Sequence, residues 1–271
     1  MTGIDRQRVQ SSFHRGAEVY DQHTPVQQRV LQRLLEQLDL PASGTSAKIL
    51  DIGCGTGRLL ELLGQRYPDA ALAGLDLAQN MLKQAAERLP VTVRLLQGDA
   101  EQLPFQAEAF SLVLSSSTFQ WLDQLEPCFK EISRVLESGG KIVFSLFGGE
   151  TLFELRESWQ QALVVCGRTR DGQQDGTHRF HTCDQVHHAL VMAGVSNVKV
   201  WSELEVVWYP DVPHLLQAIK RIGAGSAKPP AGGGLGWRRV FHEMANIYTN
   251  RFGAEGRVPV SYEVIYAAGR R

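Results

Sequence analysis

The stretch ILDIGCGTG, residues 49–57, decides how this chain folds. Its first half belongs to an apolar run that predicts a buried strand over 47–53, and a helical pattern follows over about 58–66. Glycine allows a tight turn and lets backbone N–H groups come close to a ligand. A glycine turn between a strand and a helix therefore predicts a ligand site, although glycines also occur at purely structural turns. The three glycines are Gly53, Gly55 and Gly57.

Strand and helix patterns alternate around this stretch. Further strands are predicted at 71–77, 91–99, 109–117 and 141–147, and further helices at 78–89 and 122–136, with a turn at Gly139 and Gly140. Such alternation indicates a mostly parallel sheet with helices on both faces. Elsewhere we predict helices at 25–38, 151–165, 184–193, 213–222 and 237–250, strands at 198–208 and 258–269, and a loop at 225–236. The predicted fold class is α/β, a doubly wound, mostly parallel, seven-stranded, Rossmann-like sheet with helical insertions.

Composition narrows the function classes. The 271 residues include 28 Lys and Arg against 29 Asp and Glu, and 43% are apolar, which is ordinary for a globular chain. The net charge of −1 disfavours a nucleic-acid binder, no apolar run approaches the ~20 residues that span a bilayer, and the N-terminus shows no signal-peptide pattern. Four scattered cysteines indicate free thiols. We therefore expect a cytoplasmic protein with no nucleic-acid or membrane partner.

The near-neutral total conceals an asymmetry along the chain. Residues 208–271 contain nine Lys and Arg against four Asp and Glu, a net charge of +5, so residues 1–207 carry −6. Such an imbalance often reflects solvated faces alone, but it can also mark a surface that docks an acidic partner.

Acidic residues lie at the carboxyl ends of the first three predicted strands. Asp51 lies in the quoted stretch, Asp76 comes 25 positions later, and Asp99 stands in GDAEQLPF. The carboxyl ends of parallel strands meet at one edge of the sheet, where open α/β folds bind ligands, and an acid at the second strand can accept a ribose diol. The spacing departs from the G-x-G-x-x-G of dinucleotide sites, and three acids repel a pyrophosphate, so a cationic ligand with a ribose is favoured. Each Asp could instead cap a turn.

These motifs, in this order over residues 45–147, resemble the cofactor half of the class I S-adenosylmethionine-dependent methyltransferases. The resemblance implies S-adenosylmethionine as cofactor and assigns roles to the matching positions. Gly53 and Gly55 would contact its methionine part, with Asp51 nearby, and Asp76 would bind the ribose hydroxyls. The other implied contacts are Leu77 beside the adenine, Asp99 and Ala100 at the adenine edge, and Ser115 and Ser116 bordering the sulfonium.

Segments outside the cofactor half narrow the resemblance. They are SSFHRGAEVYDQHTPVQQRV (11–30), STFQWL (117–122), FGGETLFELRESW (147–159), HRF (178–180), AIKRIGA (218–224) and VPVSYEVIYAAG (258–269). Together they are similar to the malonyl-[acyl-carrier protein] O-methyltransferases of biotin synthesis (the BioC family) over nearly the whole chain, with small departures at Val258-Pro259 and Arg221.

That resemblance implies methyl transfer from S-adenosylmethionine to the free carboxyl of a malonyl thioester, which is carried by acyl carrier protein. It also implies the organisation of the chain. We expect one methyltransferase domain, 1–271, with N-terminal lid helices at 1–40, the cofactor half at 45–147, and helical substrate-side insertions at 148–196 and 209–256.

The implied reaction requires no general acid or base from the protein. A carboxylate with a pKa near ~4 is ionised at neutral pH and needs no general base, so catalysis rests on alignment and desolvation, and no metal is required. The sequence shows no convincing metal cluster either. The substrate carboxylate does need a cationic partner, for which Arg is well suited. We favour Arg179 for this role, with Arg156 and Lys220 as alternatives.

Several expectations stay open between a functional and a structural interpretation. Arg179 could be a plain surface residue, Tyr20 could close over the cofactor or pack a helix, and Trp121 could line the acyl channel or the core. The basic tail is a candidate docking surface for the acidic carrier protein, through Lys220, Arg221, Lys228, Arg238 and Arg239. The alternative functions are a small-molecule methyltransferase acting on a quinone or another carboxylic acid, and a non-enzymatic protein that binds a methyl donor.

Overall fold

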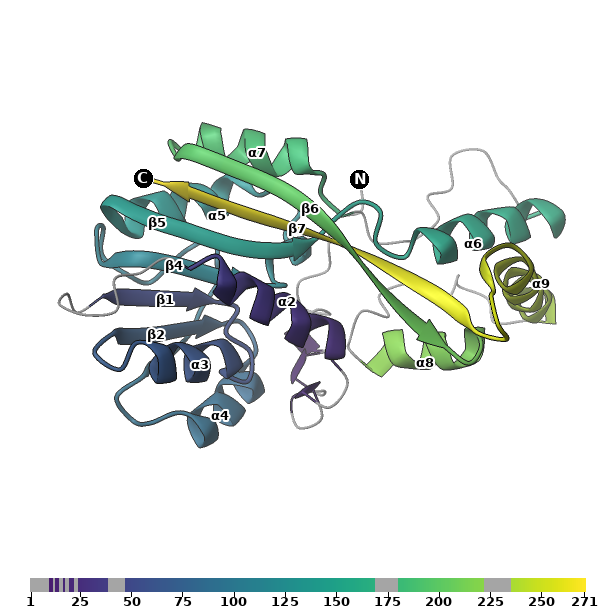
Figure 1. Ribbon diagram of the computed structural model, residues 1–271, viewed down its shortest axis with the longest axis horizontal. Helices are drawn as coiled ribbons and strands as arrows, with labels where there is room; N and C mark the ends of the chain where they lie inside the picture. The colour runs from purple at the N-terminus through teal and green to yellow at the C-terminus, as the bar shows by residue number, and fades with distance from the viewer. Residues whose placement is uncertain are drawn as a thin grey trace. The chain divides into compact units, whose positions relative to one another are not determined.

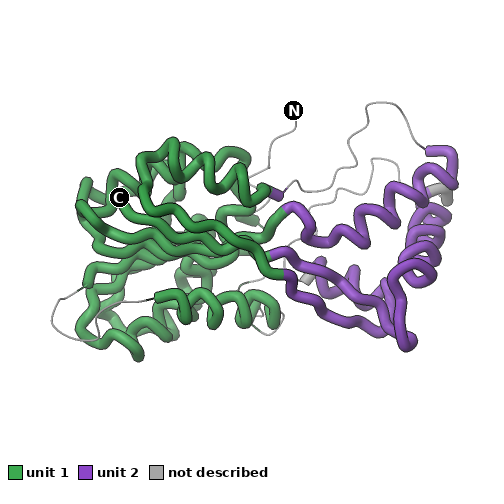
Figure 2. Tube along the Cα trace, turned by 45° about the horizontal axis from the view of Figure 1, so that its top comes forward, with its two compact units in different colours: residues 1–148, 181–203, 264–271 green, residues 149–180, 204–263 purple. Residues whose placement is uncertain are grey.

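The computed structural model describes residues 10–11, 13–14, 17, 20–21, 24–38, 47–168, 180–221 and 235–271. The chain divides into two compact units (Figure 2). Unit 1 comprises Met1–Gly148, His181–Glu203 and Val264–Arg271, and unit 2 comprises Gly149–Phe180 and Leu204–Glu263. Buried apolar side chains occur in both units.

A seven-stranded sheet in the order β3-β2-β1-β4-β5-β7-β6 forms the framework (Figure 1). The pairs β1–β2, β2–β3, β1–β4 and β4–β5 are parallel, whereas β7 runs antiparallel to β5. The structure thus confirms the predicted seven-stranded, mostly parallel sheet. The strands are β1 (Lys48–Ile52), β2 (Ala71–Asp76), β3 (Arg94–Gln97), β4 (Phe110–Ser116), β5 (Leu136–Phe147), β6 (Ser196–Tyr209) and β7 (Val258–Arg270).

Helices of unit 1 cover both faces of the parallel strands, as predicted. Four consecutive residues of β1 are buried, which is typical of a strand covered on both sides. Phe129 on α5 packs against Phe119 and Phe144, with ring centroids 5.5 and 5.1 Å away. Because β1, β2 and β3 are parallel neighbours, their carboxyl ends lie together at one edge of the sheet. The helices are α2 (Pro25–Glu36), α3 (Arg58–Arg66), α4 (Gln79–Arg88), α5 (Glu126–Val135) and α7 (Cys183–Met192).

The predicted start of α5 is wrong. The helix expected from Leu122 begins at Glu126, after a 3-10 turn at Phe119–Trp121. Pro127 stands in its first turn. Proline is tolerated there but not deeper in a helix, because it lacks an N–H donor and clashes with the preceding turn. The proline therefore sets where this helix can begin.

The turn expected at Gly139 and Gly140 is also wrong, because both residues lie inside β5. The pairing of β4 with β5 changes register between Phe110 and Leu112, and Gly139 adopts a left-handed φ of 77°. An irregularity of this kind adds residues to one strand without ending it. The two glycines therefore mark a bulge-like irregularity within β5 and not a turn that ends a helix.

Unit 2 is built from α6 (Phe153–Val165), α8 (Val212–Arg221) and α9 (Leu235–Phe252), with parts of β6 and β7. Helix α9 packs against α6 and α8. The buried carboxylate of Glu154 joins α6 to β7, because it accepts hydrogen bonds from the backbone N–H and the hydroxyl of Ser261 at 3.2 and 2.5 Å. The hydroxyl of Tyr248 donates to the carbonyl of Pro259 at 2.6 Å. Long-range polar contacts therefore help to hold this unit together.

Residues 181–196, which were expected within an insertion, belong to unit 1, where α7 packs against α5. The wider division into lid helices, cofactor half and substrate-side insertions stays a prediction. Within the described part of the chain, no helix combines the length and apolar character needed to cross a membrane.

Candidate functional site

A pocket lies at the carboxyl edge of the sheet in unit 1. The ends of β1, β2 and β3 form one side of it, and residues after β4 and from the N-terminal segment form the rest. Of the nine predicted cofactor residues, six line this pocket, and Tyr20 and Trp121 line it too. The lining residues are Phe13, Tyr20, Ile52, Gly53, Gly55, Leu75, Asp76, Leu77, Met81, Gly98, Asp99, Ala100, Thr118, Trp121 and Leu122.

The glycine turn presents bare backbone to this pocket. Gly53 and Gly55 have φ values of 73° and 53°, in the left-handed region that favours glycine. A Cβ on Gly53 would come within 2.1 Å of the Thr118 hydroxyl oxygen, so the residue is needed for packing. A Cβ on Gly55 would meet nothing within 4 Å. Gly55 therefore leaves open space where a ligand can approach the main chain.

Asp76 connects the turn to the start of α4. Its carboxylate accepts hydrogen bonds from the backbone N–H of Gly55 at 2.9 Å and of Ala78 at 2.8 Å. Burial raises the pKa of Asp76, while the backbone N–H groups of Ala78, Gly55 and Leu77 oppose the rise. A carboxylate has about four lone-pair positions. Asp76 can therefore shape the turn and still accept hydrogen bonds from a ligand.

The alternative interpretation, that the aspartates cap turns, is also realised. Asp76 accepts from the N–H two residues on, and Asp99 does the same with Glu101 at 2.9 Å. Both are Asx-type contacts. Both residues also line the pocket, so the structural and the ligand-binding interpretations do not exclude each other.

Asp51 lies behind the pocket wall and is almost fully buried, with 1% of its surface exposed. Among the described residues, its Oδ1 atom finds no hydrogen-bond partner. Burial and the nearby carboxylate of Asp76 raise the pKa of Asp51 to about 8. When Asp51 is ionised, a buried carboxylate oxygen without a partner is costly unless a positive charge compensates it. The site therefore favours a ligand that carries a cation close to the glycine turn.

Three aromatic residues also line the pocket. The ring of Phe13 lies 6.0 Å from that of Tyr20 and 5.7 Å from that of Trp121, both in edge-on geometry. Phe13 and Tyr20 also pack against a small cluster that contains Ala78 and Met81. Burial, and then the carboxylates of Asp76 and Asp21, raise the pKa of Tyr20. Its hydroxyl therefore stays protonated at neutral pH.

Some predicted residues do not line the pocket. Ser115 is fully buried and donates to the carbonyl of Ile52 at 2.8 Å, which ties β4 to β1. Ser116 is half-buried beside it. In unit 2, the guanidinium of Arg156 donates to the carbonyls of Thr151 and Gly149, and Lys220 is exposed on α8. Arg179 lies outside the described residues.

Sequence reasoning missed several pocket residues. Phe13 could have been found, because Phe13, Ala17 and Tyr20 follow the four-and-three spacing of a helix face. Thr118 carries no comparable signal, since its place against Gly53 comes from a contact 65 positions away. The other missed residues are Ile52, Leu75, Met81, Gly98 and Leu122.

Several cations of the basic tail are engaged within the fold. Arg251 pairs with Glu157 at 2.5 Å. Arg257 pairs with Glu255, and Arg271 pairs with Glu108. Arg270 donates to the carbonyl of Gly139. Lys220 on α8 and Arg238 and Arg239 on α9 are exposed, whereas Lys228 and the side chain of Arg221 lie outside the described residues. As for metals, no group of three His, Cys, Asp or Glu side chains suited to an ion occurs in the described part of the chain.

Known proteins share the sequence and the fold. A family described as "Methyltransferase domain" matches residues 50–144. The malonyl-[acyl-carrier protein] O-methyltransferase of Geobacter sulfurreducens is 46% identical over 271 residues, covering 99% of this chain and 100% of that protein. The protein of the same name from Methylovorus sp. is 34% identical, covering 97% and 88%. The YcgJ protein of Bacillus subtilis shares the fold, with a TM-score of 0.60 at 15% identity and coverage of 90% and 98%.

Proposed function

The chain belongs to the malonyl-[acyl-carrier protein] O-methyltransferase family, and we propose that it methylates the free carboxyl of malonyl-acyl carrier protein with S-adenosylmethionine. The product is the malonyl methyl ester that would prime pimeloyl synthesis on the way to biotin. The observation that carries the proposed substrate is the 46% identity to a relative of that name over the full length of both chains. The pocket in unit 1 supports the proposed cofactor.

The residues of the pocket fit S-adenosylmethionine. Asp51 offers a buried carboxylate oxygen that has no hydrogen-bond partner among the described residues, and this suits a ligand with positive charge. Asp76, at the end of β2, keeps acceptor positions for ribose hydroxyls. The open space at Gly55 admits a ligand against the main chain. Charge, ribose recognition and shape thus point to the same ligand.

We assign the protein's contributions as follows. Gly53 and Gly55 hold the methionine part with Asp51 nearby, and Asp76 binds the ribose. Leu77, Asp99 and Ala100 surround the adenine. Ser115 and Ser116, which border the sulfonium in the resemblance, act from behind the pocket, because Ser115 fixes β4 against β1. When bound, the cofactor supplies an activated methyl group.

The protein needs to align the acceptor and to keep water out. The acceptor is a carboxylate with a pKa near ~4, which is ionised at neutral pH and needs no base. Tyr20 is protonated at neutral pH, as an ordinary tyrosine is, and burial raises its pKa further, so it adds no negative charge beside the acceptor. With Phe13 and Trp121 it forms an apolar wall that excludes water from the cofactor.

The substrate carboxylate needs a cation, and the candidates differ in how freely they can supply one. Two guanidinium nitrogens of Arg156 already donate to the backbone carbonyls of Thr151 and Gly149. That use favours a structural role in starting α6. We therefore keep Arg179 as the proposed partner of the carboxylate, with Lys220 next, since its ammonium is exposed.

Acyl carrier protein is the proposed macromolecular partner, and the surface of α8 and α9 is the proposed docking surface. These helices pack against each other and carry the exposed cations Lys220, Arg238 and Arg239. Arg168 adds a fourth, 4.6 Å from the ring centre of Trp237, which is the neighbour of Arg238. A basic surface of this kind would steer an acidic carrier protein. The absence of a nucleic-acid partner and the cytoplasmic location stay predictions.

An acceptor panel tests the proposed function. Purified protein and S-adenosylmethionine are incubated with malonyl-acyl carrier protein, a small malonyl thioester, a quinone precursor or aconitate, and S-adenosylhomocysteine is quantified. We expect the highest kcat/KM with malonyl-acyl carrier protein. Higher kcat/KM with a quinone or aconitate would instead support a small-molecule methyltransferase. Binding of S-adenosylmethionine without turnover on any acceptor would support a non-enzymatic protein that binds a methyl donor.

A further inference from the structure

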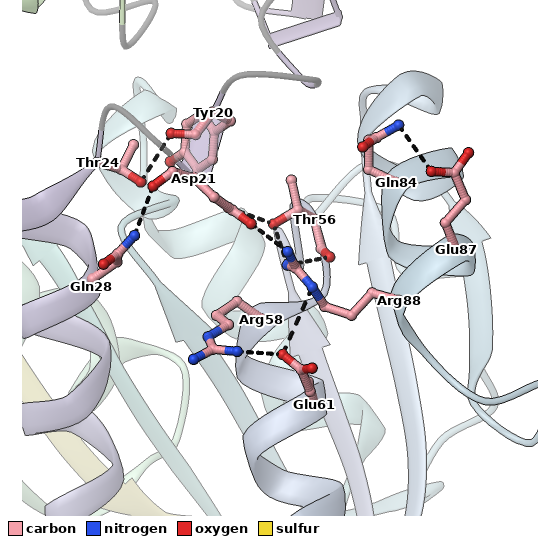
Figure 3. Close-up of polar contacts among 10 residues, drawn as sticks. All are labelled: Tyr20, Asp21, Thr24, Gln28, Thr56, Arg58, Glu61, Gln84, Glu87 and Arg88. Carbon is pink, nitrogen blue, oxygen red and sulfur yellow. Dashed lines mark hydrogen bonds and ion pairs between the residues drawn. The ribbon is translucent and has the colours of Figure 1, made fainter.

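Arg88, the last residue of α4, joins three parts of unit 1 (Figure 3). Its guanidinium donates to the carboxylate of Asp21 at 2.5 Å and to the carbonyl and hydroxyl oxygens of Thr56, both at 2.9 Å. Glu61 on α3 lies further off, with an N–O distance of 3.7 Å. Arg88 is not among the described residues that line the pocket. Its contacts nevertheless reach the glycine turn and the N-terminal segment.

The three groups form a closed arrangement. The hydroxyl of Thr56 donates to the second carboxylate oxygen of Asp21 at 2.8 Å, so Asp21 is held by Thr56 and by Arg88 together (Figure 3). Thr56 is buried and stands between the last two glycines of the turn. The side chains of Arg88 and Asp21 are 27% and 35% exposed. Hydrogen bonds between charged groups that are partly buried in this way are stronger than neutral hydrogen bonds.

Asp21 directly follows Tyr20, which forms the wall of the pocket with Phe13. Among the described residues, two neutral hydrogen bonds also connect this segment to the remainder of unit 1: Gln10 donates to the carbonyl of Leu77 at 2.8 Å, and Asn80 donates to that of His14 at 3.0 Å. The pair between Asp21 and Arg88 is the charged contact beside them, one residue from the aromatic wall. Arg88 thus connects the residue next to Tyr20 to the glycine turn, although Arg88 itself does not line the pocket among the described residues.

We infer that Arg88 is a positioning residue for the cofactor pocket, which holds Tyr20 in the pocket wall through Asp21 and Thr56. The inference rests on the proposed function, because it takes the pocket to bind S-adenosylmethionine. Its consequence is that the affinity for the cofactor depends on an ion pair outside the pocket. By reciprocity, a bound cofactor should strengthen the attachment of residues 20–21 to the glycine turn.

Calorimetric titration with S-adenosylhomocysteine measures the effect. We expect Arg88→Gln to raise Kd about three- to tenfold, the range expected when a partly exposed, charged hydrogen bond is lost. Asp21→Asn should raise Kd by a similar factor, and the double variant should be no worse than either single variant, because each of the three variants has lost the same Asp21–Arg88 ion pair. Arg88→Lys keeps the charge but not the fork of donors, so we expect it to recover part of the affinity.

Arg58→Gln is the matched control. Arg58 pairs with Glu61 at 2.6 Å and directly follows the glycine turn, but no hydrogen bond or ion pair recorded in the described residues links it to Asp21. Its Kd should stay within about twofold of the wild-type value, as expected for an exposed pair. Hydrogen exchange supplies a readout besides affinity. Bound S-adenosylhomocysteine should slow exchange around residues 20–28 in the wild type and less so in Arg88→Gln.

The Tyr20→Ala background separates positioning from a direct effect on the turn. If Arg88 acts through Tyr20, Arg88→Gln causes no further loss of affinity once Tyr20 is absent. An undiminished loss in that background, or equal losses in Arg88→Gln and Arg58→Gln, would overturn the inference. A wild-type protein that binds neither S-adenosylmethionine nor S-adenosylhomocysteine would instead refute the proposed function. Wild-type affinity in a folded Arg88→Gln variant would refute the positioning role alone.

Discussion

The cofactor edge of unit 1 and the helical region of unit 2 place their polar side chains in different ways. At the edge, Asp76 is fixed by backbone N–H groups only two and 21 positions away, within two consecutive strand–turn–helix repeats. In unit 2, Glu154 is fixed by Ser261, which is 107 positions away in the sequence. A site built on local backbone geometry is visible as a short motif. A site built on distant contacts becomes visible only in the folded chain.

Removing the carboxylate of Asp76 should test the local half of this comparison most severely. We expect Asp76→Ala to raise the Kd for S-adenosylmethionine about 100-fold or more, because charged hydrogen bonds to the turn and to the ribose, each worth about 1.5–3 kcal/mol, are lost together. Calorimetry measures the affinity, and circular dichroism checks the fold. Glu87→Ala, on the exposed side of α4, is the control and should bind normally. Unchanged binding by Asp76→Ala would contradict the cofactor assignment.

Two of the three glycines in the turn, Gly53 and Gly55, should separate packing from binding. Gly53→Ala places a methyl group against Thr118, so we expect a loss of about 1–3 kcal/mol in the free energy of unfolding. Gly55→Ala meets open space, and we expect a cost of only about 1 kcal/mol from its left-handed backbone. Its methyl group enters the space that we assign to the cofactor, so Kd should rise about tenfold or more. Chemical denaturation and calorimetry measure both quantities, and the reverse pattern would contradict the assignment.

Glu154 tests the distant half of the comparison. Glu154→Gln weakens the buried contacts to Ser261, and we expect a loss of about 1–3 kcal/mol in the free energy of unfolding. Glu157→Gln, which breaks an exposed pair with Arg251, should cost less than about 1 kcal/mol. Both variants should keep the wild-type Kd for S-adenosylmethionine, because unit 1 contains the pocket residues. An equal cost in the two variants would show that burial of Glu154 adds nothing.

The sequence predicted the cofactor edge better than the remainder of the site for the reason that this comparison gives. The alternation of strands and helices, with glycines and acids at the strand ends, indicated one ligand-binding edge, and the methyltransferase resemblance assigned its positions. Of these, Gly53, Gly55, Asp76, Leu77, Asp99 and Ala100 line the pocket. Thr118 was missed, since only tertiary packing brings it against Gly53. Arg156 was an alternative candidate for the substrate carboxylate, and the sequence did not show that its guanidinium donates to two carbonyls just before its own helix.

In the fold, too, local patterns were predictable and features that depend on tertiary context were not. Seven strands and their mostly parallel order followed from apolar periodicity. The start of α5 and the path of β5 through Gly139 and Gly140 were mispredicted, because a helix pattern and a glycine pair each allow more than one boundary. The basic tail read from the sequence does not form a single surface. Arg270 and Arg271 belong to unit 1, where they contact the carbonyl of Gly139 and the carboxylate of Glu108.

The pH dependence of stability tests the raised pKa of Asp51. Burial and Asp76 raise its pKa from 3.8 to about 8. The folded protein thus holds a proton that the unfolded chain has already lost, so this contribution to stability is full below pH 4 and is lost as the pH rises towards 8. Asp51→Asn should therefore gain stability relative to wild type as the pH rises from 5 to 8. Thermal unfolding across this range measures the gain, and a pH-independent difference would contradict the shifted pKa.

The same titration should control binding of a cation. Only the ionised form of Asp51 attracts a positive ligand, so the affinity for S-adenosylmethionine should rise with pH below 8, by up to about tenfold per unit, and level off above it. Calorimetry at several pH values checks the slope. In Asp51→Asn the slope should be absent over the same range.

The smallest expected effect concerns the exposed cations of unit 2. Reversing Arg238 and Arg239 to Glu should raise KM for malonyl-acyl carrier protein several-fold at low salt, and less at high salt, because exposed charges mainly steer association. KM for a small malonyl thioester should stay unchanged. Arg257→Glu, at a cation that pairs with Glu255, is the control. If both substrates respond alike, the surface of α8 and α9 does not dock the carrier protein.

The central claim is methyl transfer to the free carboxyl of malonyl-acyl carrier protein. Mass spectrometry of the carrier protein tests it directly, after incubation with the purified enzyme and S-adenosylmethionine. We predict that malonyl-acyl carrier protein gains the mass of one methylene unit, that acetyl-acyl carrier protein, which has no free carboxyl, gains nothing, and that Asp76→Ala abolishes the gain. An unmodified malonyl-acyl carrier protein in the presence of folded, cofactor-binding enzyme would contradict the account.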